Sequence, residues 1–196
     1  TIYAAMMKSL DDGVGNIMKA LEDAGLSGQT IVIFTNDNGG ERYSDNGGLA
    51  KAKSTLWEGG IRVPAFVRWP AKIEAGKITL QVAITMDWTA TILAAGGTKA
   101  HHDFPLDGVD LMPVLTGKKP IRERTFYWRT FQRIKQQAVR EGNWKYLQDE
   151  KGEYLFDLAS DPKEMNNLKE KHPDVFNALK KKFEKWEQTV LKPIPF

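Results

Sequence analysis

The residues with the clearest chemical potential stand where an apolar run ends in polar groups. Residues 31–34 are Ile-Val-Ile-Phe, and the chain continues as Thr35-Asn36-Asp37-Asn38-Gly39-Gly40. Asp37 and Asn38 offer hard oxygen donors, which suit Ca²⁺ or Mg²⁺ better than zinc. The sequence Asp-Asn-Gly-Gly at 37–40 is also typical of a turn. Two donors cannot complete a calcium site of about six to eight oxygens. A turn and part of a metal site therefore both remain possible.

Lys53 is the second candidate, because a fixed cation near a metal can offset negative charge on an anionic oxygen. Lys51 stands two residues earlier, and spacing does not choose between the two lysines. A solvated surface lysine is the alternative for either position. Further along, Glu58 and Arg62 are predicted to pair across a turn. Gly59-Gly60 is interpreted as a backbone requirement, since glycine adopts positive φ readily.

Other charged clusters are better explained as surface. Asp11-Asp12 falls on a predicted helix, where neighbouring charges are usually solvated. His101-His102-Asp103 has no matching ligands nearby, so surface histidines are the favoured interpretation. Lys180-Lys181-Lys182, with Lys185, is predicted to be the outer face of a helix. No Gly-x-Ser-x-Gly motif is present to mark a serine nucleophile.

The composition restricts the classes of function. The 196 residues are 41% hydrophobic, with a net charge of +3 that does not suggest nucleic-acid or membrane binding. No apolar run approaches the roughly 20 residues of a membrane span. Zero cysteines exclude disulfides, zinc thiolates and a cysteine nucleophile within this sequence. The chain begins with Thr1 in a predicted helix, without a signal sequence, which suggests a fragment or a processed chain.

Hydrophobic spacing predicts the elements of the first half. Apolar residues three and four apart predict a helix over 3–24, in which two glycines indicate close packing. The strand 30–35 lacks alternation, which is typical of a parallel strand covered by helices on both faces. Strands are also predicted over 63–68 and 78–84. Asp87 is predicted to cap the next helix, which Gly96-Gly97 closes.

The second half has a different pattern. After a long connection with a helical turn at 111–115, short strands separated by turns predict an antiparallel meander. These strands cover 125–129, 136–140, 144–147 and 154–157. Pro173 then opens a final helix, whose inward residues are predicted to be Val175, Phe176, Leu179, Phe183, Trp186 and Val190.

In this order the motifs resemble an arylsulfatase-type sulfatase of the alkaline-phosphatase-like superfamily, and the likeness runs almost end to end. Its longest segments are Phe34-Thr35-Asn36-Asp37-Asn38-Gly39-Gly40, residues 53–64 (KSTLWEGGIRVP), residues 106–117 (LDGVDLMPVLTG) and residues 138–146 (AVREGNWKY). Shorter matches lie at residues 3–6 and 10–15, and at residues 154–158 with Asp161-Pro162, Glu164 and Asn167-Leu168. The family's C-terminal part is the portion that they resemble. The implied fold is α/β: the C-terminal portion of a mixed or parallel sheet sandwiched by helices, then a small antiparallel sheet with a C-terminal helix. The implied domains are 1–120 and 121–196.

The resemblance also implies roles for the candidate residues. Asp37 and Asn38 correspond to ligands of a Ca²⁺ site, with Mg²⁺ as the alternative, and Lys53 corresponds to a lysine that contacts the substrate sulfate. The family's nucleophile is a formylglycine made within a Cys/Ser-x-Pro-x-Arg motif, which this sequence lacks. The remaining metal aspartates and the catalytic histidines are also expected in a missing N-terminal half. The substrate would be a sulfate ester, either an aryl sulfate or a sulfated glycan, and the compartment periplasmic or extracellular.

Three functions therefore remain open. The leading one is a sulfuric ester hydrolase in which this chain supplies part of the site and is inactive alone. A phosphonate or phosphodiester hydrolase of the same superfamily is a close variant. A non-catalytic module that binds a sugar or a partner is different in kind, and exposed aromatic side chains would support it. The candidates for such a surface are Trp69, Trp128, Phe131 and Trp144.

Overall fold

The computed structural model describes residues 2–41, 43–131 and 134–192. The chain forms two compact units, one of residues 1–35 and 64–122 and the other of residues 36–63 and 123–196. The chain passes from one unit to the other three times, and the last of these crossings, between residues 122 and 123, falls close to the predicted boundary at residue 120. Residues 36–63, however, associate with the C-terminal unit. The division into domains 1–120 and 121–196 stays a prediction.

The first unit begins with α1 (Ile2–Asp23) and the strand β1 (Val32–Thr35). β1 pairs with β2 (Ala65–Arg68) in antiparallel register, with Ile33 opposite Val67. The strand over 30–35 was predicted to be parallel to its neighbour, and this prediction is wrong for the pairing of β1 with β2. After β1 the chain forms residues 36–63 of the second unit, and it rejoins the first unit at residue 64 to form β2, which runs antiparallel to β1. β1 is mostly half-buried and β2 is mostly exposed. Among the described residues, nothing lies within 4 Å of a Cβ built at Gly13 or Gly15 in α1, against the close packing predicted there.

The strand predicted over 78–84 is wrong, because this segment is irregular and has no strand pairing among the described residues. Ile78 and Leu80 are exposed, so the segment has no apolar face to bury. The side-chain amide of Gln81 takes the place of a backbone ladder. Its Nε2 donates to the carbonyl oxygen of Arg122 at 3.0 Å, and its Oε1 accepts from the N–H of Arg122 at 2.8 Å.

Asp87 is buried in the first turn of α3 (Met86–Ala95) instead of preceding that helix. Its carboxylate accepts the backbone N–H of Ile84 at 2.9 Å, as a capping group would. Its other oxygen accepts the N–H of Val109 at 2.9 Å, which ties the connection before α4 (Met112–Leu115) to the helix. Asp87 therefore accepts hydrogen bonds from two backbone N–H groups, one before α3 and one on the connection to α4.

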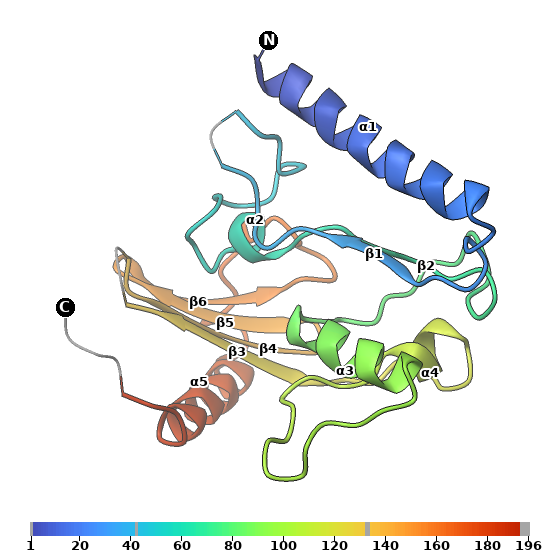
Figure 1. Ribbon diagram of the computed structural model, residues 1–196. Helices are drawn as coiled ribbons and strands as arrows, with labels where there is room; N and C mark the ends of the chain where they lie inside the picture. The colour runs from blue at the N-terminus through green and yellow to red at the C-terminus, as the bar shows by residue number, and fades with distance from the viewer. Residues whose placement is uncertain (1, 42, 132–133, 193–196) are drawn as a thin grey trace. The chain divides into compact units, whose positions relative to one another are not determined.

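The second unit is built on a four-stranded antiparallel meander, as predicted, visible with its flanking helix in Figure 1. The order β3-β4-β5-β6 follows the sequence, with bounds of Thr125–Thr130, Gln136–Glu141, Trp144–Asp149 and Gly152–Asp157. Alternation of side chains gives the sheet two buried faces. One face packs against α5 (Pro173–Glu187), and the other packs against the segment before the short helix α2 (Glu58–Ile61).

The two faces have separate apolar cores. On the α5 side the buried residues are Val139, Tyr146, Leu155, Leu179 and Phe183. On the α2 side they are Leu56, Trp57, Ala138, Leu147, Phe156 and Leu158. Of the inward residues predicted for the last helix, Val190 alone lies beyond its end at Glu187. None of the described helices combines the length and the apolar character that crossing a membrane requires.

Candidate functional site

Asp37 and Asn38 lie in a bend that is separated from the end of β1 by one residue. The side chain of Asp37 is exposed and that of Asn38 is half-buried. Within the described residues, neither side chain forms a hydrogen bond or an ion pair. Their oxygens are therefore free to coordinate a cation, and a carboxylate with an amide carbonyl fits Ca²⁺ or Mg²⁺ as part of a larger ligand set.

The glycines after this pair press its backbone against the turn of α2. The N–H of Gly39 donates to the carbonyl oxygen of Gly60 at 2.8 Å. A Cβ built on Gly39 would lie 1.8 Å from the carbonyl oxygen of Gly59, so no larger side chain fits. The segment that carries Asp37 and Asn38 is thus fixed by a backbone contact to the Glu-Gly-Gly turn.

Gly59 and Gly60 serve close packing, and the predicted need for positive φ is wrong, since neither has a positive φ. A Cβ on Gly59 would lie 2.4 Å from the carbonyl oxygen of Ala50, and one on Gly60 would lie 2.2 Å from that of Thr55. The N–H of Gly59 donates to Ala50 at 2.8 Å. Three stretches of backbone therefore converge at this turn.

Lys53 is joined to the same arrangement through its backbone. Its N–H donates to the carbonyl oxygen of Gly40 at 3.0 Å, which links it to the segment after Asn38. Its side chain is exposed, and its ammonium group has no ion-pair partner among the described residues. Lys51 differs, because its Nζ lies 5.8 Å above the ring of Trp57. Because Lys51 contacts an aromatic ring and Lys53 contacts none within the described part of the chain, Lys53 is the cation more available to bind an anion.

The backbone around Lys53 is held in an unusual conformation. Lys51 and Ser54 have positive φ values of 60° and 71°. Non-glycine residues in this region cost of order 1–3 kcal/mol each and persist where the surrounding structure imposes them, often at binding sites. A tightly determined loop of this kind is consistent with a lysine that must be presented in one position.

Asn46 organises this loop and was not among the residues singled out from the sequence. Its Oδ1 accepts the N–H of Gly40 at 2.9 Å, while its Nδ2 donates to the carbonyl oxygen of Lys51 at 3.3 Å. Asn46 thereby ties the segment of Asp37 and Asn38 to the segment of Lys53. The Asn-Gly pair at 46–47 signalled a turn but not this bridge. Arg42, in the same loop, lies outside the described residues.

A second unpredicted feature is a buried ion cluster on the α2 side of the sheet. Nζ of Lys145 lies 2.8 Å from Oε1 of Glu58 and 2.7 Å from Oε1 of Glu164. The predicted pair of Glu58 and Arg62 is present but looser, at 3.7 Å. A lysine inside the strand sequence Trp-Lys-Tyr-Leu was the available signal, because a lysine in a buried strand needs a partner.

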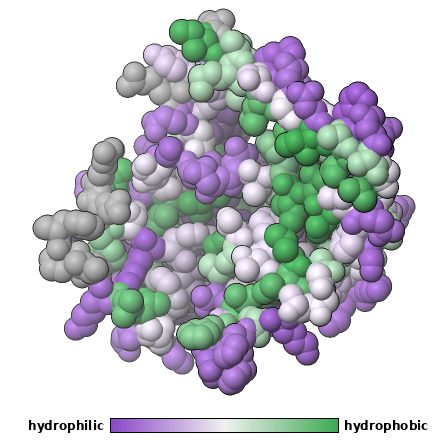
Figure 2. All heavy atoms as spheres, in the orientation of Figure 1, coloured by the Kyte–Doolittle hydropathy of each residue, from purple (hydrophilic) through white to green (hydrophobic). Residues whose placement is uncertain are grey.

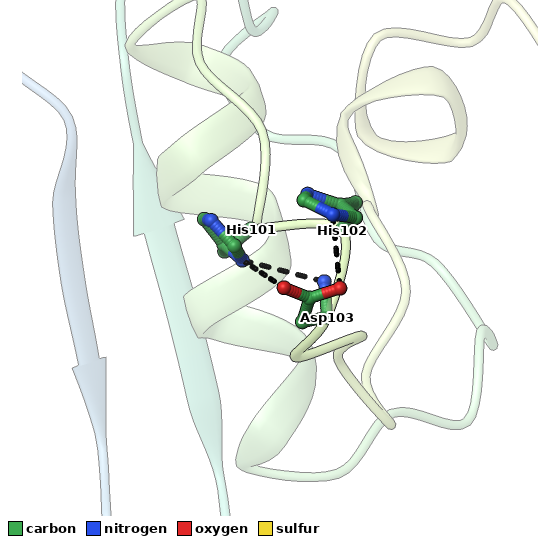
Figure 3. Close-up of side chains that lie close together, drawn as sticks. All are labelled: His101, His102 and Asp103. Atoms are coloured by element: carbon green, nitrogen blue, oxygen red, sulfur yellow. Dashed lines mark hydrogen bonds and ion pairs between the residues drawn. The ribbon is translucent and has the colours of Figure 1, made fainter.

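The histidine cluster is a separate surface feature of the first unit. Nε2 of His102 lies 2.9 Å from one oxygen of Asp103, and Nδ1 of His101 lies 3.7 Å from the other (Figure 3). All three are exposed and adjacent in sequence. Their ligand atoms are close enough to share a metal ion, but no further ligand joins them among the described residues, which supports the interpretation as surface.

The family of the chain follows from comparison with known proteins. A model of the Sulfatase family matches residues 1–98, and one described as N-sulphoglucosamine sulphohydrolase, C-terminal, matches residues 51–189. The chain belongs to the sulfatase family. Mouse N-acetylgalactosamine-6-sulfatase is 36% identical over 133 residues, which are 65% of this chain and 26% of that protein. Bovine arylsulfatase A is 38% identical over 168 residues, 82% of this chain and 33% of that protein.

Solved structures agree with the family. Ps i-CgsB superposes with a TM-score of 0.88 at 27% identity, over 94% of this chain and 42% of the other. A phosphonate monoester hydrolase of Agrobacterium radiobacter superposes with a TM-score of 0.72 at 24% identity over 97% of this chain, a likeness of fold alone. The chain spans about a quarter to a third of the length of the curated relatives given above. Its homologues are sulfuric ester hydrolases, which supports a sulfatase-type function.

Proposed function

We propose that this chain provides part of the metal and sulfate site of a sulfuric ester hydrolase. Asp37 and Asn38 would supply two oxygen ligands to Ca²⁺, with Mg²⁺ as the alternative, and Lys53 would contact the sulfate. The observation that carries the proposal is the hydrogen bond from the N–H of Lys53 to Gly40, which couples the cation to the segment after the two ligands.

The chemistry of the site divides between the cation and the chain. Bound Ca²⁺ supplies a Lewis acid that polarises a sulfate oxygen. Asp37 contributes a negative charge that holds the cation, and Asn38 contributes a neutral carbonyl oxygen. The ammonium group of Lys53 offsets negative charge on the sulfate oxygens, and its effect is greatest when the site excludes water. Asn46 and the glycine contacts keep these groups in one arrangement.

The proposal requires a second part of the protein. Its nucleophile, a formylglycine, its other metal ligands and its histidines have no counterpart in the motifs of this sequence. Apolar residues of α1 are exposed, including Met6, Leu10 and Ile17, and an apolar helix face of this kind is typical of a covered surface. Hydrophobic residues (green) also remain on the face visible in Figure 2. We propose that an N-terminal half covers α1, and that the complete protein acts in the periplasm or outside the cell.

The two alternatives have unequal support. A phosphonate or phosphodiester hydrolase uses a comparable site for a tetrahedral oxyanion, and the phosphonate monoester hydrolase has the same fold. A non-catalytic binding module would present aromatic side chains to solvent. Trp69 is instead buried, while Trp128 and Trp144 pack beside the apolar cores of the second unit. The binding module is therefore the weaker alternative.

Substitution of Lys53 tests the proposed function. Lys53→Ala in the complete protein should lower kcat for an aryl sulfate by about 10²–10³-fold, as loss of a group that stabilises an oxyanion does. Lys51→Ala is the matched control, since Lys51 lies in the same loop against Trp57, and it should change kcat less than threefold. Equal rates for Lys53→Ala and wild type would contradict the role of Lys53. Faster hydrolysis of a phosphonate ester than of any sulfate ester would favour the first alternative.

A further inference from the structure

The buried ion cluster of Lys145, Glu58 and Glu164 includes the first residue of the Glu-Gly-Gly turn. The side chains of Lys145 and Glu164 are completely buried, and that of Glu58 is 2% exposed. Lys145 lies on β5 between Arg140 of β4 and Phe156 of β6. Nη1 of Arg140 lies 3.8 Å from Oε2 of Glu58. The cluster therefore joins three neighbouring segments of the second unit around one lysine.

Glu164 holds the backbone of the turn as well as the lysine. Its Oε2 accepts the backbone N–H of Glu58 at 2.6 Å, at the beginning of α2. It adopts a positive φ of 55°, an unfavourable conformation for glutamate. Burial raises the pKa of Glu164 above its usual range, although Lys145 and the N–H of Glu58 oppose this. A strained, desolvated glutamate is thus retained where it can hold both partners.

Such a cluster is a poor means of gaining stability alone. Burying ions costs desolvation free energy, and apolar residues of similar volume often stabilise a core equally well or better. The cluster does contact Glu58 at both its carboxylate and its backbone N–H, and Glu58 is continuous with Gly59 and Gly60. Gly60 accepts the N–H of Gly39, directly after Asn38. A chain of direct contacts therefore runs from Lys145 to the candidate metal ligands.

We propose that Lys145, together with Glu164, is a positioning group for the segment that carries Asp37, Asn38 and Lys53. The side chain of Lys145 is completely buried, so it would act without contacting substrate or metal. Lys145 holds the carboxylate of Glu58, and Gly60 in the same turn of α2 accepts the backbone N–H of Gly39. The functional part of this inference rests on the proposed function, because positioning matters for catalysis only if the segment binds metal and sulfate.

The double variant Lys145→Met/Glu164→Gln tests the inference in the complete protein. It removes one charge of each sign, so the net charge of the cluster is unchanged and Glu58 keeps Arg140 and Arg62 nearby. Leu179→Ala is the matched control, because Leu179 is buried in the core on the opposite face of the sheet. The two variants are compared by hydrogen exchange, calcium titration and steady-state kinetics.

The expected result separates position from stability. In the double variant, amide exchange in peptides from 36–60 should rise at least tenfold, and calcium affinity should fall at least tenfold. At saturating calcium, kcat should remain reduced while KM changes less. Leu179→Ala should affect exchange in α5 and leave calcium affinity within twofold of wild type.

Unchanged exchange over 36–60, or the same increase in Leu179→Ala, would overturn the inference. If the double variant does not fold, Glu164→Gln alone gives the same comparison with a smaller change, at least threefold in exchange over 36–60; no change there would likewise overturn it. The exchange measurement requires neither metal nor substrate. Absence of sulfate turnover in the wild-type protein would therefore refute the proposed function without deciding the inference.

Discussion

Gly39→Ala separates the two backbone segments that the proposed site depends on. The added methyl group would lie 1.8 Å from the carbonyl oxygen of Gly59 and 3.0 Å from Cα of Gly60. An ordinary carbon–oxygen contact is about 3.3 Å, so the segments must move apart by roughly 1.5 Å. That movement also breaks the 2.8 Å hydrogen bond from Gly39 to Gly60.

The size of the effect follows from these two changes. Overpacking a tight contact costs about 1–3 kcal/mol, and loss of a backbone hydrogen bond costs about 1 kcal/mol. We expect Gly39→Ala to lower the free energy of unfolding by about 2–4 kcal/mol. Because Asn38 is the adjacent residue, calcium affinity should fall at least tenfold as well.

Urea denaturation followed by tryptophan fluorescence measures the first effect, and calcium titration by calorimetry measures the second. Gly28→Ala is the matched control, because it makes the same chemical change where nothing lies within 4 Å of the new methyl group. It should leave the free energy of unfolding within about 0.5 kcal/mol. A Gly39→Ala protein as stable as the control, with wild-type calcium affinity, would refute the reasoning.

Three further predictions concern other parts of the chain. The pKa of Glu153 is lowered, because hydrogen bonds from Lys180 and Tyr146 outweigh desolvation; this group therefore stabilises the fold above about pH 4.5, and the contribution is lost as pH falls through the folded-state pKa. Glu153→Gln should cost about 0.5–1 kcal/mol in urea denaturation at pH 7 and less at pH 3, with Glu150→Gln as control; an equal loss at both pH values would contradict this. Leu10→Glu should destabilise the complete protein by more than about 2 kcal/mol if an N-terminal half covers α1, whereas the neighbouring Asp11→Asn should be neutral. The isolated 196-residue chain should hydrolyse no aryl sulfate and bind calcium weakly, so turnover by the pure chain would contradict the division of the site.

Local patterns predicted those elements whose stabilising contacts are local. Alternating strands and tight turns specified the meander, and the spacing of Leu179 and Phe183 specified the buried face of α5. The antiparallel pairing of β1 with β2 could not be read in this way, since the apolar run 31–34 does not state which strand returns beside it. The predicted strand over 78–84 was wrong because side-chain pairing by Gln81 leaves no periodic signal.

The sequence was enough to name the candidate site residues, but not the contacts that hold them in place. Asp37, Asn38 and Lys53 were identified by residue type and by family resemblance, and their roles stay predictions. The role of Asn46 depends on contacts with Gly40 and Lys51, which sequence spacing does not reveal. The partners of Lys145 lie 87 residues earlier and on a loop after β6, so only the folded chain brings them together.

The most direct test of the central claim is calcium binding by Asp37→Ala in the complete protein, measured by calorimetry. Asp45→Ala is the matched control, because Asp45 is exposed in the same loop and accepts only the nearby N–H of Gly47 among the described residues. We expect Asp37→Ala to weaken calcium binding at least 100-fold (about 2.7 kcal/mol) and Asp45→Ala to change it less than threefold. Wild-type calcium affinity in Asp37→Ala would contradict the assignment of Asp37 and Asn38 to a metal site.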